Sequence, residues 1–357
     1  MWVWPSLWKR NNGKAQIVTK HELSKIAVIG AGSWGTTLAN LLAGKGHKVD
    51  LWVREEEVFD QIKTNRVNQV FLPGMELVPG LNPVLSYEEA LSDKKLVLLV
   101  VPSHVFRDVL ANMKSYLKPG MSLMAATKGI ENKTLMIMSQ VAESVLSDDY
   151  MERFGCLAGP SFAKEVYKKH PTAVTIACRD LAHAEKLQEL FYTGYFRIYI
   201  SEDLTGVQVA GALKNVIAIG AGAADGLQVG PNARAALITR GLAEITRLGV
   251  AMGANPLTLA GLAGIGDLVL TCTGDLSRNR TVGLKMGKGM SLEEITGSMN
   301  MVAEGIKTAR SVYELGKKME VELPISNQVY HILYNGKDPQ KAVRELMTRE
   351  LKVELEH

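Results

Sequence analysis

The 357-residue sequence predicts an α/β domain with a doubly wound sheet, followed by an all-helical domain. An apolar run passes through a glycine-rich turn into a helix over residues 25–40. Short apolar runs then alternate with helical segments, and after about residue 205 long Ala- and Gly-rich segments follow without a convincing strand. We therefore expect an N-terminal extension at 1–24, a sheet domain at 25–205, a helical domain at 206–345 and a tail at 346–357.

Composition narrows the class of protein. The net charge is only +4 and no long basic run occurs, which argues against nucleic acid but allows a local basic pocket for an anionic substrate. The three cysteines, Cys156, Cys178 and Cys272, are far apart and show no CxxC spacing, so we expect no metal site and a reducing, cytoplasmic location. Polar residues interrupt every apolar stretch before it reaches the length of about 20 residues that a membrane helix needs.

The stretch 25–40 reads KIAVIGAGSWGTTLAN and contains the GxGxxG pattern of a dinucleotide-binding turn. Gly30 would allow the sharp turn after the strand, and Gly32 would let the backbone approach a pyrophosphate. Gly35 would let the helix pack against the strand. The free N–H groups and positive dipole at the start of the helix would attract the pyrophosphate. The pattern lies between a strand and a helix, so we predict a Rossmann-type sheet rather than a glycine turn that binds nothing.

The run 48–53 (KVDLWV) reads as the second strand of this unit. Asp50 has the spacing of an acid that binds the ribose 2′-hydroxyl of NAD, but it lies in mid-strand. Arg54 stands at the end of the strand, where a guanidinium suits the 2′-phosphate of NADP. The cofactor is therefore NADP(H) or NAD(H), with the preference toward NADP(H). Alternatively, Arg54 is a solvated side chain that pairs with the acids at 55–57.

Further strands are expected at apolar runs, and ligands should bind beyond their carboxyl ends. Lys128 and the segment 159–162 lie just past two such runs. A capping box at Ser86 should begin a helix, and a second one is at Ser291. The predicted strands are 96–101, 122–126, 154–158, 173–178 and 196–200, and the later helices include 207–224, 233–248, 307–318 and 327–333.

Lys214 lies in VAGALKNVIAIG, a helix that is apolar on nearly every side. Such a helix should be buried, and a buried ammonium group needs a lowered pKa or a carboxylate partner. This favours a lysine that exchanges a proton with a substrate hydroxyl over one that extends to the surface. Lys128 could meet a phosphate or a carbonyl oxygen, or be an ordinary loop lysine. Asp267 could hold Lys214 or a substrate hydroxyl, or cap the helix that follows.

The segment Ser277–Arg278–Asn279–Arg280 is a compact group of donors that fits a substrate or cofactor phosphate, with a solvated turn as the alternative. His104 follows a strand end without an obvious carboxylate partner, so we interpret it as structural.

Together these segments resemble the soluble bacterial NAD(P)-dependent glycerol-3-phosphate dehydrogenases over about residues 25–344. The segments that carry the resemblance are GAGSWGTTLA, ATKGIE, LAGPSFAKEV, ALKNVIAIGAG, NARAALITRG, GLAGIGDLVLTC, LSRNRTVG and VAEGIKTA. The resemblance implies reversible reduction of dihydroxyacetone phosphate to sn-glycerol 3-phosphate, which supplies phospholipid synthesis.

The resemblance also implies roles for particular residues. Lys214 would be the proton donor and acceptor, and Lys128 would touch both cofactor and substrate. The cofactor would further contact Ser33, Trp34, Arg54, Ala163, Arg278, Val302 and Glu304. The substrate would contact Gly159, Ser161, Asp267, Ser277, Arg278 and Asn279.

Two other functions stay open, namely a related two-domain reductase of hydroxy or keto acids and a non-catalytic NADPH-binding regulator. We expect a homodimer through the Ala-rich helices, because small side chains allow close helix contact.

Overall fold

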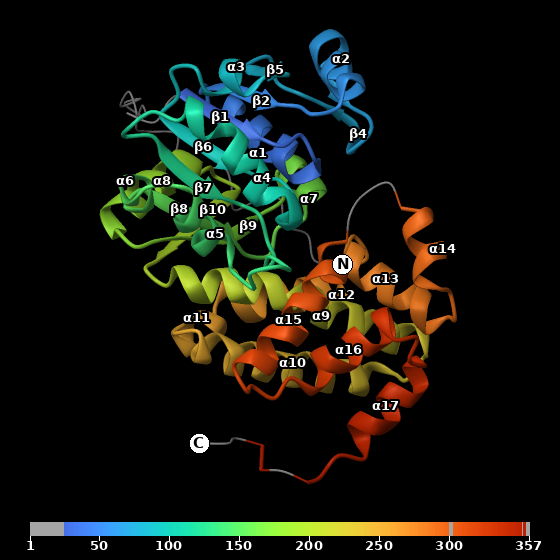
Figure 1. Ribbon diagram of the computed structural model, residues 1–357. Coiled ribbons are helices and arrows are strands. Elements are labelled where there is room, and N and C mark those ends of the chain that lie inside the picture. Colours follow the sequence, from blue (N-terminus) through green and yellow to red (C-terminus); the bar gives the residue numbers. More distant parts are fainter. Residues whose placement is uncertain (1–24, 300–302, 352, 355–357) are drawn as a thin grey trace, which may run out of the picture.

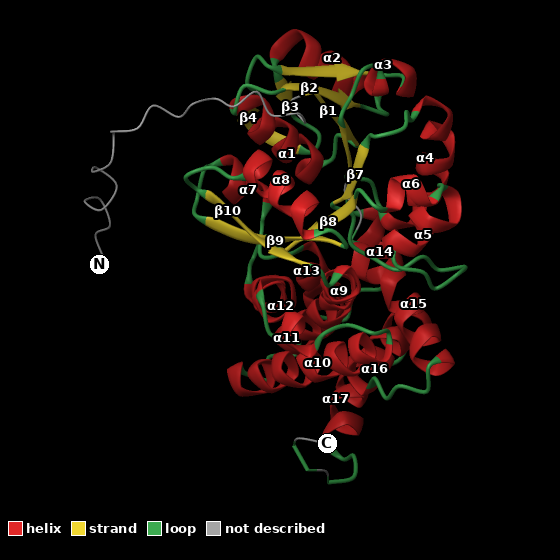
Figure 2. Cartoon of the chain, turned by 90° about the vertical axis from the view of Figure 1, so that its left-hand side faces the viewer, coloured by secondary structure: helices red, strands yellow, loops and turns green. Residues whose placement is uncertain are grey.

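The computed structural model describes residues 25–299, 303–351 and 353–354. The predicted extension at 1–24 therefore lies outside the described residues. Figure 2 shows the strands gathered in the upper part of the molecule and a wholly helical part below them. The last strand ends at Ser201 and the first helix of the helical part begins at Leu204.

An eight-stranded sheet forms the upper part, in the order β10-β9-β8-β7-β6-β1-β2-β5. Its pairs are parallel except β8 with β9, which is antiparallel. The strands are β1 (Lys25–Ile29), β2 (Lys48–Trp52), β5 (Leu81–Val84), β6 (Leu96–Leu99), β7 (Ser122–Ala125), β8 (Phe154–Ala158), β9 (Thr172–Cys178) and β10 (Phe196–Ser201). The chain reverses its direction of progress between β1 and β6, so the carboxyl ends of these two strands define the ligand-binding crevice.

Helices cover both faces of the sheet (Figure 1). Ile26 and Val28 of β1 pack in one core with Leu38 of α1, while Ala27 and Ile29 pack in a second core on the other face. Burial on both faces explains why the central strands are continuous apolar runs. The helices are α1 (Ser33–Gly44), α2 (Glu56–Asn65), α3 (Tyr87–Leu91), α4 (Phe106–Met113), α5 (Met138–Val145), α6 (Asp148–Met151), α7 (Ala163–Tyr167) and α8 (Leu181–Phe191).

The predicted strands are confirmed with ends that shift by one or two residues, and the fold class is confirmed. The structure adds β5 and a small antiparallel pair, β3 (Val67–Asn68) with β4 (Leu72–Glu76), which were not predicted. β5 was missed because it contains Pro83, and a proline argues against a strand in the middle of a sheet. Proline is tolerated here because β5 is an edge strand, where its missing N–H is not needed for a ladder hydrogen bond. Ser86 caps α3 by accepting a hydrogen bond from the N–H of Glu89, which is one of the two bonds of the predicted capping box.

The helical part is built around α9 (Leu204–Gly226), which is buried along most of its length (Figure 1). Around it lie α10 (Pro231–Ala251), α11 (Pro256–Leu259), α12 (Asp267–Thr273), α13 (Arg278–Gly287), α14 (Leu292–Gly297), α15 (Glu304–Lys318), α16 (Pro324–Tyr334) and α17 (Pro339–Met347). Among the residues described after 203, no strand occurs, as predicted. The predicted capping box at Ser291 is present at the start of α14.

Glycines bring α9 and α13 into backbone contact. A Cβ on Gly222 would lie 2.0 Å from the carbonyl oxygen of Arg280, and one on Gly283 would lie 1.9 Å from that of Ile219. The small residues of α9 are therefore used for packing inside the chain. Any dimer contact through Ala-rich helices would then have to use α10, whose first turns are largely exposed.

Two segments are long and apolar enough to span a membrane by length and composition alone. The first is α9, of which 94% of the apolar window is buried inside the protein. The second, Pro256–Thr273, is divided between α11, a π-helical segment η3 (Leu262–Gly266) and α12. Helices of a protein core pass the same test, so this composition is weak evidence for a membrane span.

Candidate active site

The turn between β1 and α1 has the geometry that its three glycines require. Gly30 adopts a φ of +113°, and a Cβ there would lie 2.7 Å from the carbonyl oxygen of Val100. A Cβ on Gly35 would lie 1.9 Å from the carbonyl oxygen of Gly30, so this position packs the helix against the strand. A Cβ on Gly32, by contrast, would meet no atom of the described residues within 4 Å. Only Gly32 therefore faces open space, where a ligand can approach the backbone.

The start of α1 fits the pyrophosphate of a dinucleotide. Among the described residues, no side chain caps this helix and no acidic residue lies in its first turn. The indole Nε1 of Trp34 is buried and has no hydrogen-bond partner in the described part of the chain. Ala163 lies beside this turn, because its carbonyl oxygen accepts a hydrogen bond from Thr37 of α1 at 3.4 Å. Unused donors at a positive helix end are suited to bind an anion.

Arg54 follows β2 and is exposed, and its guanidinium contacts Glu55 at 2.6 Å. This is the contact that the solvated alternative predicted, so binding of a 2′-phosphate would require Arg54 to leave Glu55. Asp50 pairs with Lys94 and accepts a hydrogen bond from Asn82 at 2.8 Å. Its carboxylate is thus engaged beside the sheet edge and does not reach the end of β2.

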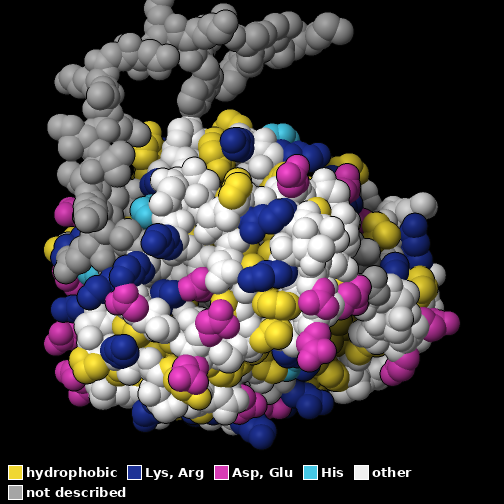
Figure 3. Space-filling model, turned by 90° about the horizontal axis from the view of Figure 1, so that it is seen from above, with side chains coloured by type: hydrophobic (Ala, Val, Ile, Leu, Met, Phe, Trp, Pro, Cys, Tyr) yellow, Lys and Arg dark blue, Asp and Glu magenta, His cyan; other side chains and the backbone are white. Residues whose placement is uncertain are grey.

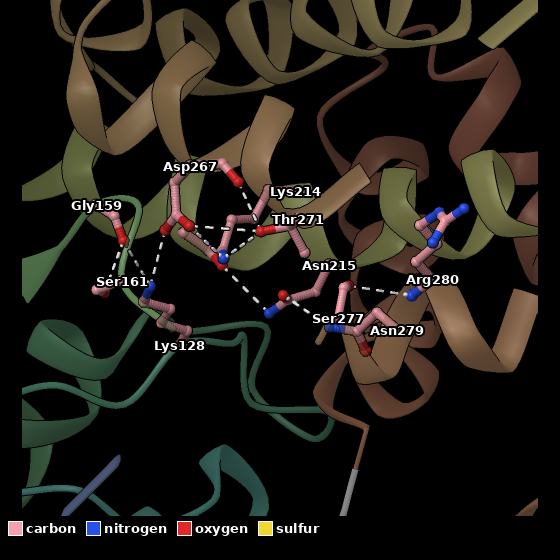
Figure 4. Close-up of polar contacts among 11 residues, drawn as sticks. Lys128, Gly159, Ser161, Lys214, Asn215, Asp267, Thr271, Ser277, Asn279 and Arg280 are labelled. Carbon is pink, nitrogen blue, oxygen red and sulfur yellow. Dashed lines mark hydrogen bonds and ion pairs between the residues drawn. The ribbon is translucent and has the colours of Figure 1, made fainter. Parts of the chain in front are cut away.

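A buried cluster of two lysines and one carboxylate joins the sheet to the helices (Figure 4). Lys214 of α9 donates from Nζ to Oδ1 of Asp267 at 2.7 Å and to Oγ1 of Thr271 at 2.8 Å. Lys128, beyond the end of β7, donates to the other oxygen, Oδ2, at 2.7 Å. The side chains of Lys214 and Asp267 are 8% and 2% exposed, and that of Lys128 is 18% exposed. The prediction of a buried Lys214 is confirmed.

The cluster shifts the pKa values of its members. Loss of water on burial, aided by the positive charge of Lys128, lowers the pKa of Lys214 to about 8, although Asp267 opposes this shift. Burial alone would raise the pKa of Asp267, but the charges and hydrogen bonds of the two lysines outweigh it and hold the pKa below its usual value. Lys214 can therefore change protonation state near neutral pH while Asp267 stays ionised.

Local backbone features place these groups. Gly211, one turn before Lys214 in α9, packs against the stem of Lys128, and a Cβ there would be in ordinary contact with the Lys128 Cγ at 3.6 Å. The π-helical segment η3 directs the chain into α12 so that Asp267 begins that helix. Gly266 occupies the N-cap position of α12, and Asp267 turns its carboxylate to the lysines. The capping alternative for Asp267 is therefore wrong.

The donor segment at the start of α13 lies beside this cluster. Ser277 caps α13 by accepting from the N–H of Arg280 at 3.2 Å, and Arg280 is paired with Asp225 and Asp275. Asn279 donates to Oδ1 of Asn215, the neighbour of Lys214, at 2.9 Å.

Arg278 is exposed, and among the described residues its guanidinium has no ion-pair or hydrogen-bond partner. It is thus the member of the segment that can bind an external anion.

Residues beyond the carboxyl ends of the strands complete the surroundings. The carbonyl oxygen of Gly159 accepts from Ser161 at 2.9 Å and from Lys128 at 3.4 Å. Glu304, at the start of α15, accepts from the hydroxyl of Ser103 at 2.6 Å and from its N–H at 3.3 Å. Burial raises the pKa of Glu304. Val302, predicted to contact the cofactor, lies outside the described residues.

Sequence reasoning missed three polar residues here: Thr271, Asn215 and Ser103. Thr271 lies four residues after Asp267, a spacing that places both on one side of α12. Asn215 directly follows the chosen lysine, and Ser103 follows the apolar run of β6. His104, which we interpreted as structural, has an exposed side chain, and partial loss of water lowers its pKa.

A dinucleotide-type glycine turn in the sheet part, together with a buried lysine that a carboxylate holds, is the combination of a nicotinamide-nucleotide-dependent dehydrogenase. Two family models agree. NAD-dependent glycerol-3-phosphate dehydrogenase N-terminus matches residues 25–184, and NAD-dependent glycerol-3-phosphate dehydrogenase C-terminus matches residues 203–344. The chain belongs to this family, as the sequence resemblance predicted.

Individual relatives are similar over nearly the whole chain. The glycerol-3-phosphate dehydrogenase [NAD(P)+] of Geobacter sulfurreducens is 57% identical over 330 residues, which are 92% of this chain and 98% of the relative. That of Geobacter metallireducens is 58% identical with the same coverage. The crystal structure of glycerol-3-phosphate dehydrogenase from Coxiella burnetii superposes with a TM-score of 0.87 at 39% identity, covering 91% of this chain and 99% of that one.

Proposed function

We propose that the protein catalyses the reversible, NAD(P)H-dependent reduction of dihydroxyacetone phosphate to sn-glycerol 3-phosphate. The observation that carries this proposal is the buried Lys214–Asp267–Lys128 cluster, held between the sheet and the helices. The names of the relatives support the substrate, since relatives at 57% and 58% identity are glycerol-3-phosphate dehydrogenases [NAD(P)+].

The cofactor would be held by the glycine turn. The open face of Gly32 and the uncapped N–H groups of Ser33, Trp34 and Gly35 would bind the pyrophosphate. Arg54 would bind a 2′-phosphate after releasing Glu55, which favours NADP(H) over NAD(H). Beyond the glycine turn, the cofactor would contact Ala163, Arg278, Glu304 and Val302. When bound, the nicotinamide supplies the hydride that reduces the substrate carbonyl carbon.

Lys214 would supply the proton. As the carbonyl oxygen gains negative charge, the Lys214 ammonium would donate to it, and in the reverse direction the neutral amine would take the proton back. A pKa of about 8 leaves most of the amine protonated at pH 7, yet close enough to that pH to lose its proton readily. Thr271 and Asp267 hold the amine, and the neighbouring Asn215 links α9 to α13 by accepting a hydrogen bond from Asn279.

Lys128 would add a second positive charge near the developing oxyanion. Both oxygens of Asp267 accept from lysines, so its role would be to keep the two amines together. Arg278 would bind the substrate phosphate with help from Ser277 and Asn279, and this remote binding energy would hold the carbonyl in place. Gly159 and Ser161 would line the substrate site beside Lys128.

The direct test is kcat/KM for dihydroxyacetone phosphate with NADPH and with NADH, beside dihydroxyacetone and a small keto acid. We expect the phosphorylated ketone to be the best substrate by at least about a hundredfold, since a charged phosphate contact contributes roughly 3 kcal/mol. A keto acid as the better substrate would favour the related reductase. Nucleotide binding without any turnover would favour the regulator.

Four broader assignments belong to the same proposal. We infer a cytoplasmic enzyme without membrane insertion, which its three buried free cysteines support. We infer supply of glycerol phosphate for phospholipid synthesis and a homodimer through α10, which a light-scattering mass in solution would test. We also assign residues 25–205 to a cofactor domain and 206–345 to a helical substrate domain.

A further inference from the structure

A charged hollow lies at the amino ends of the central strands, whereas the active site lies at their carboxyl ends. It is lined by residues that precede β6, β7 and β8 and by the start of α8: Asp93, Lys94, Lys95, Lys118, Pro119, Gly120, Met121, Ser122, Arg153, Asp180, His183 and Lys186. Its volume is about 390 Å³, within the range of small-ligand sites. The glycine turn begins at the other end of the strands, which are about 15 Å long. A ligand in this hollow would therefore not touch the catalytic cluster.

The hollow is basic, with five cationic side chains against two carboxylates. Lys94 pairs with Asp50, Asp93 pairs with Lys25, and Arg153 donates to the carbonyl oxygen of Gly120 at 2.9 Å. In the described part of the chain, the other three cations, Lys95, Lys118 and Lys186, form no ion pair within 4 Å, although Asp93 attracts Lys95 and Lys118 from a longer distance. Several Lys and Arg side chains lie along the left-hand edge of the molecule in Figure 3, on the side where Figure 1 places α6 and α8. An anion between these cations would relieve their mutual repulsion.

His183 supplies an independent sign of a missing ligand. This residue lines the hollow, is only 7% exposed, and its Nε2 has no hydrogen-bond partner among the described residues. A buried polar nitrogen without a partner is costly and calls for an explanation. Nε2 is closed to solvent, so contact with an anion in the hollow requires the imidazole to rotate toward it; when protonated, Nε2 then carries a hydrogen that can be donated to an anion oxygen.

We propose that this hollow, which we call the basic hollow, binds a small tetrahedral dianion of the phosphate or sulfate type, held by Lys118, Lys186 and the imidazole of His183. The proposal concerns a soluble anion rather than a lipid headgroup, because the imidazole is too deeply buried to meet a membrane surface. It does not depend on the reaction proposed above.

Protonation of His183 should be coupled to binding. Burial lowers the pKa of His183, and Lys186 and Arg153 lower it further, while Asp180 and a hydrogen bond to the backbone of Arg153 oppose the shift. Lys95, Lys118 and Asp93 face the same hollow from the loops before β6 and β7. A bound dianion would stabilise the imidazolium, so binding should be tighter at low pH.

The test uses the full chain and sulfate, whose charge is constant between about pH 5.5 and pH 8, with chloride of equal ionic strength as reference. Histidine C–H signals are followed by NMR, and the signal of His183 among the seven histidines is assigned with His183→Gln. We expect saturable sulfate binding to raise the pH midpoint of His183 by about one unit, which corresponds to binding about tenfold tighter at low pH.

A double substitution tests the site itself. Lys118→Gln with Lys186→Gln should weaken the sulfate effect on His183 about tenfold. The control, Lys63→Gln with Lys288→Gln, removes the same charge from exposed positions elsewhere and should leave the effect unchanged. The proposal is overturned if sulfate shifts His183 no more than chloride does, or if both double variants respond alike. It is also overturned if only vesicles of anionic phospholipid produce the shift.

Discussion

Replacing Asp267 with Asn would remove the charge shared by two lysines without changing the shape of the cluster. Each lysine nitrogen lies 2.7 Å from an Asp267 oxygen. Coulomb's law with an effective dielectric constant of about 20 gives roughly 6 kcal/mol of attraction for each contact before the cost of lost water. Breaking a buried pair typically lowers the free energy of unfolding by about 3–5 kcal/mol. A loss of only about 1.4 kcal/mol of electrostatic stabilisation of the Lys214 ammonium would lower the pKa of Lys214 by about one unit.

The assay is kcat for dihydroxyacetone phosphate reduction as a function of pH. Reduction needs the protonated amine, so the wild-type rate should be full well below pH 8 and should fall as pH rises through the Lys214 pKa of about 8. In Asp267→Asn this fall should move to about pH 7 or below.

Asp225→Asn is the matched control. It removes a carboxylate paired with Arg234 and Arg280, eleven residues along α9 from Lys214. Asp225→Asn should lower the free energy of unfolding without changing the pH at which kcat falls. An Asp267→Asn profile that falls at the wild-type pH would refute the assignment of Lys214 as the acid.

Four further substitutions test the remaining parts of the site. Arg278→Ala should raise KM for the phosphorylated ketone about 10- to 100-fold with a small change in kcat, and should leave unphosphorylated dihydroxyacetone unaffected. Gly32→Ala should fold normally, since no atom in the described part of the chain lies within 4 Å of the added Cβ, yet weaken nucleotide binding in a fluorescence titration. Gly35→Ala should instead lose stability in a denaturant titration, because its Cβ would lie 1.9 Å from the Gly30 oxygen. Arg54→Ala should reduce the preference for NADPH over NADH about tenfold in kcat/KM, and an unchanged ratio would place the 2′-phosphate elsewhere.

The sheet was predictable where strands are buried on both faces. Ile26 and Ala27 pack into different cores, so the whole run of β1 must be apolar and stands out in the sequence. Edge elements lack that signal. β5 contains Pro83, and β3 has two residues, so neither shows a pattern that a short window can detect. The antiparallel pairing of β9 depends on a connection through α7, which local sequence does not specify.

The site was predictable where a residue conflicts with its surroundings. Lys214 stands out as a charge in an apolar helix, and its burial followed from that conflict. The contact of Lys128 with Asp267 joins positions 139 residues apart, so only the packing of the two parts could reveal it. Asp267 faces the lysines instead of capping α12 because a π-helical segment precedes it, and this segment could not be predicted from the local sequence GIGD. Thr271 could not be singled out from the sequence, because a threonine in a helix is compatible with its surroundings and needs no charged partner.

The central claim is that Lys214 exchanges the proton of the reaction, and turnover by Lys214→Ala tests it most directly. Single-turnover reduction of dihydroxyacetone phosphate with NADPH should slow by about 100- to 10,000-fold, the range for loss of a general acid. Binding of NADPH, measured by fluorescence, should remain within about threefold of the wild type, because Lys214 lies in the helical part and not in the glycine turn. Near-normal turnover with intact nucleotide binding would contradict the account.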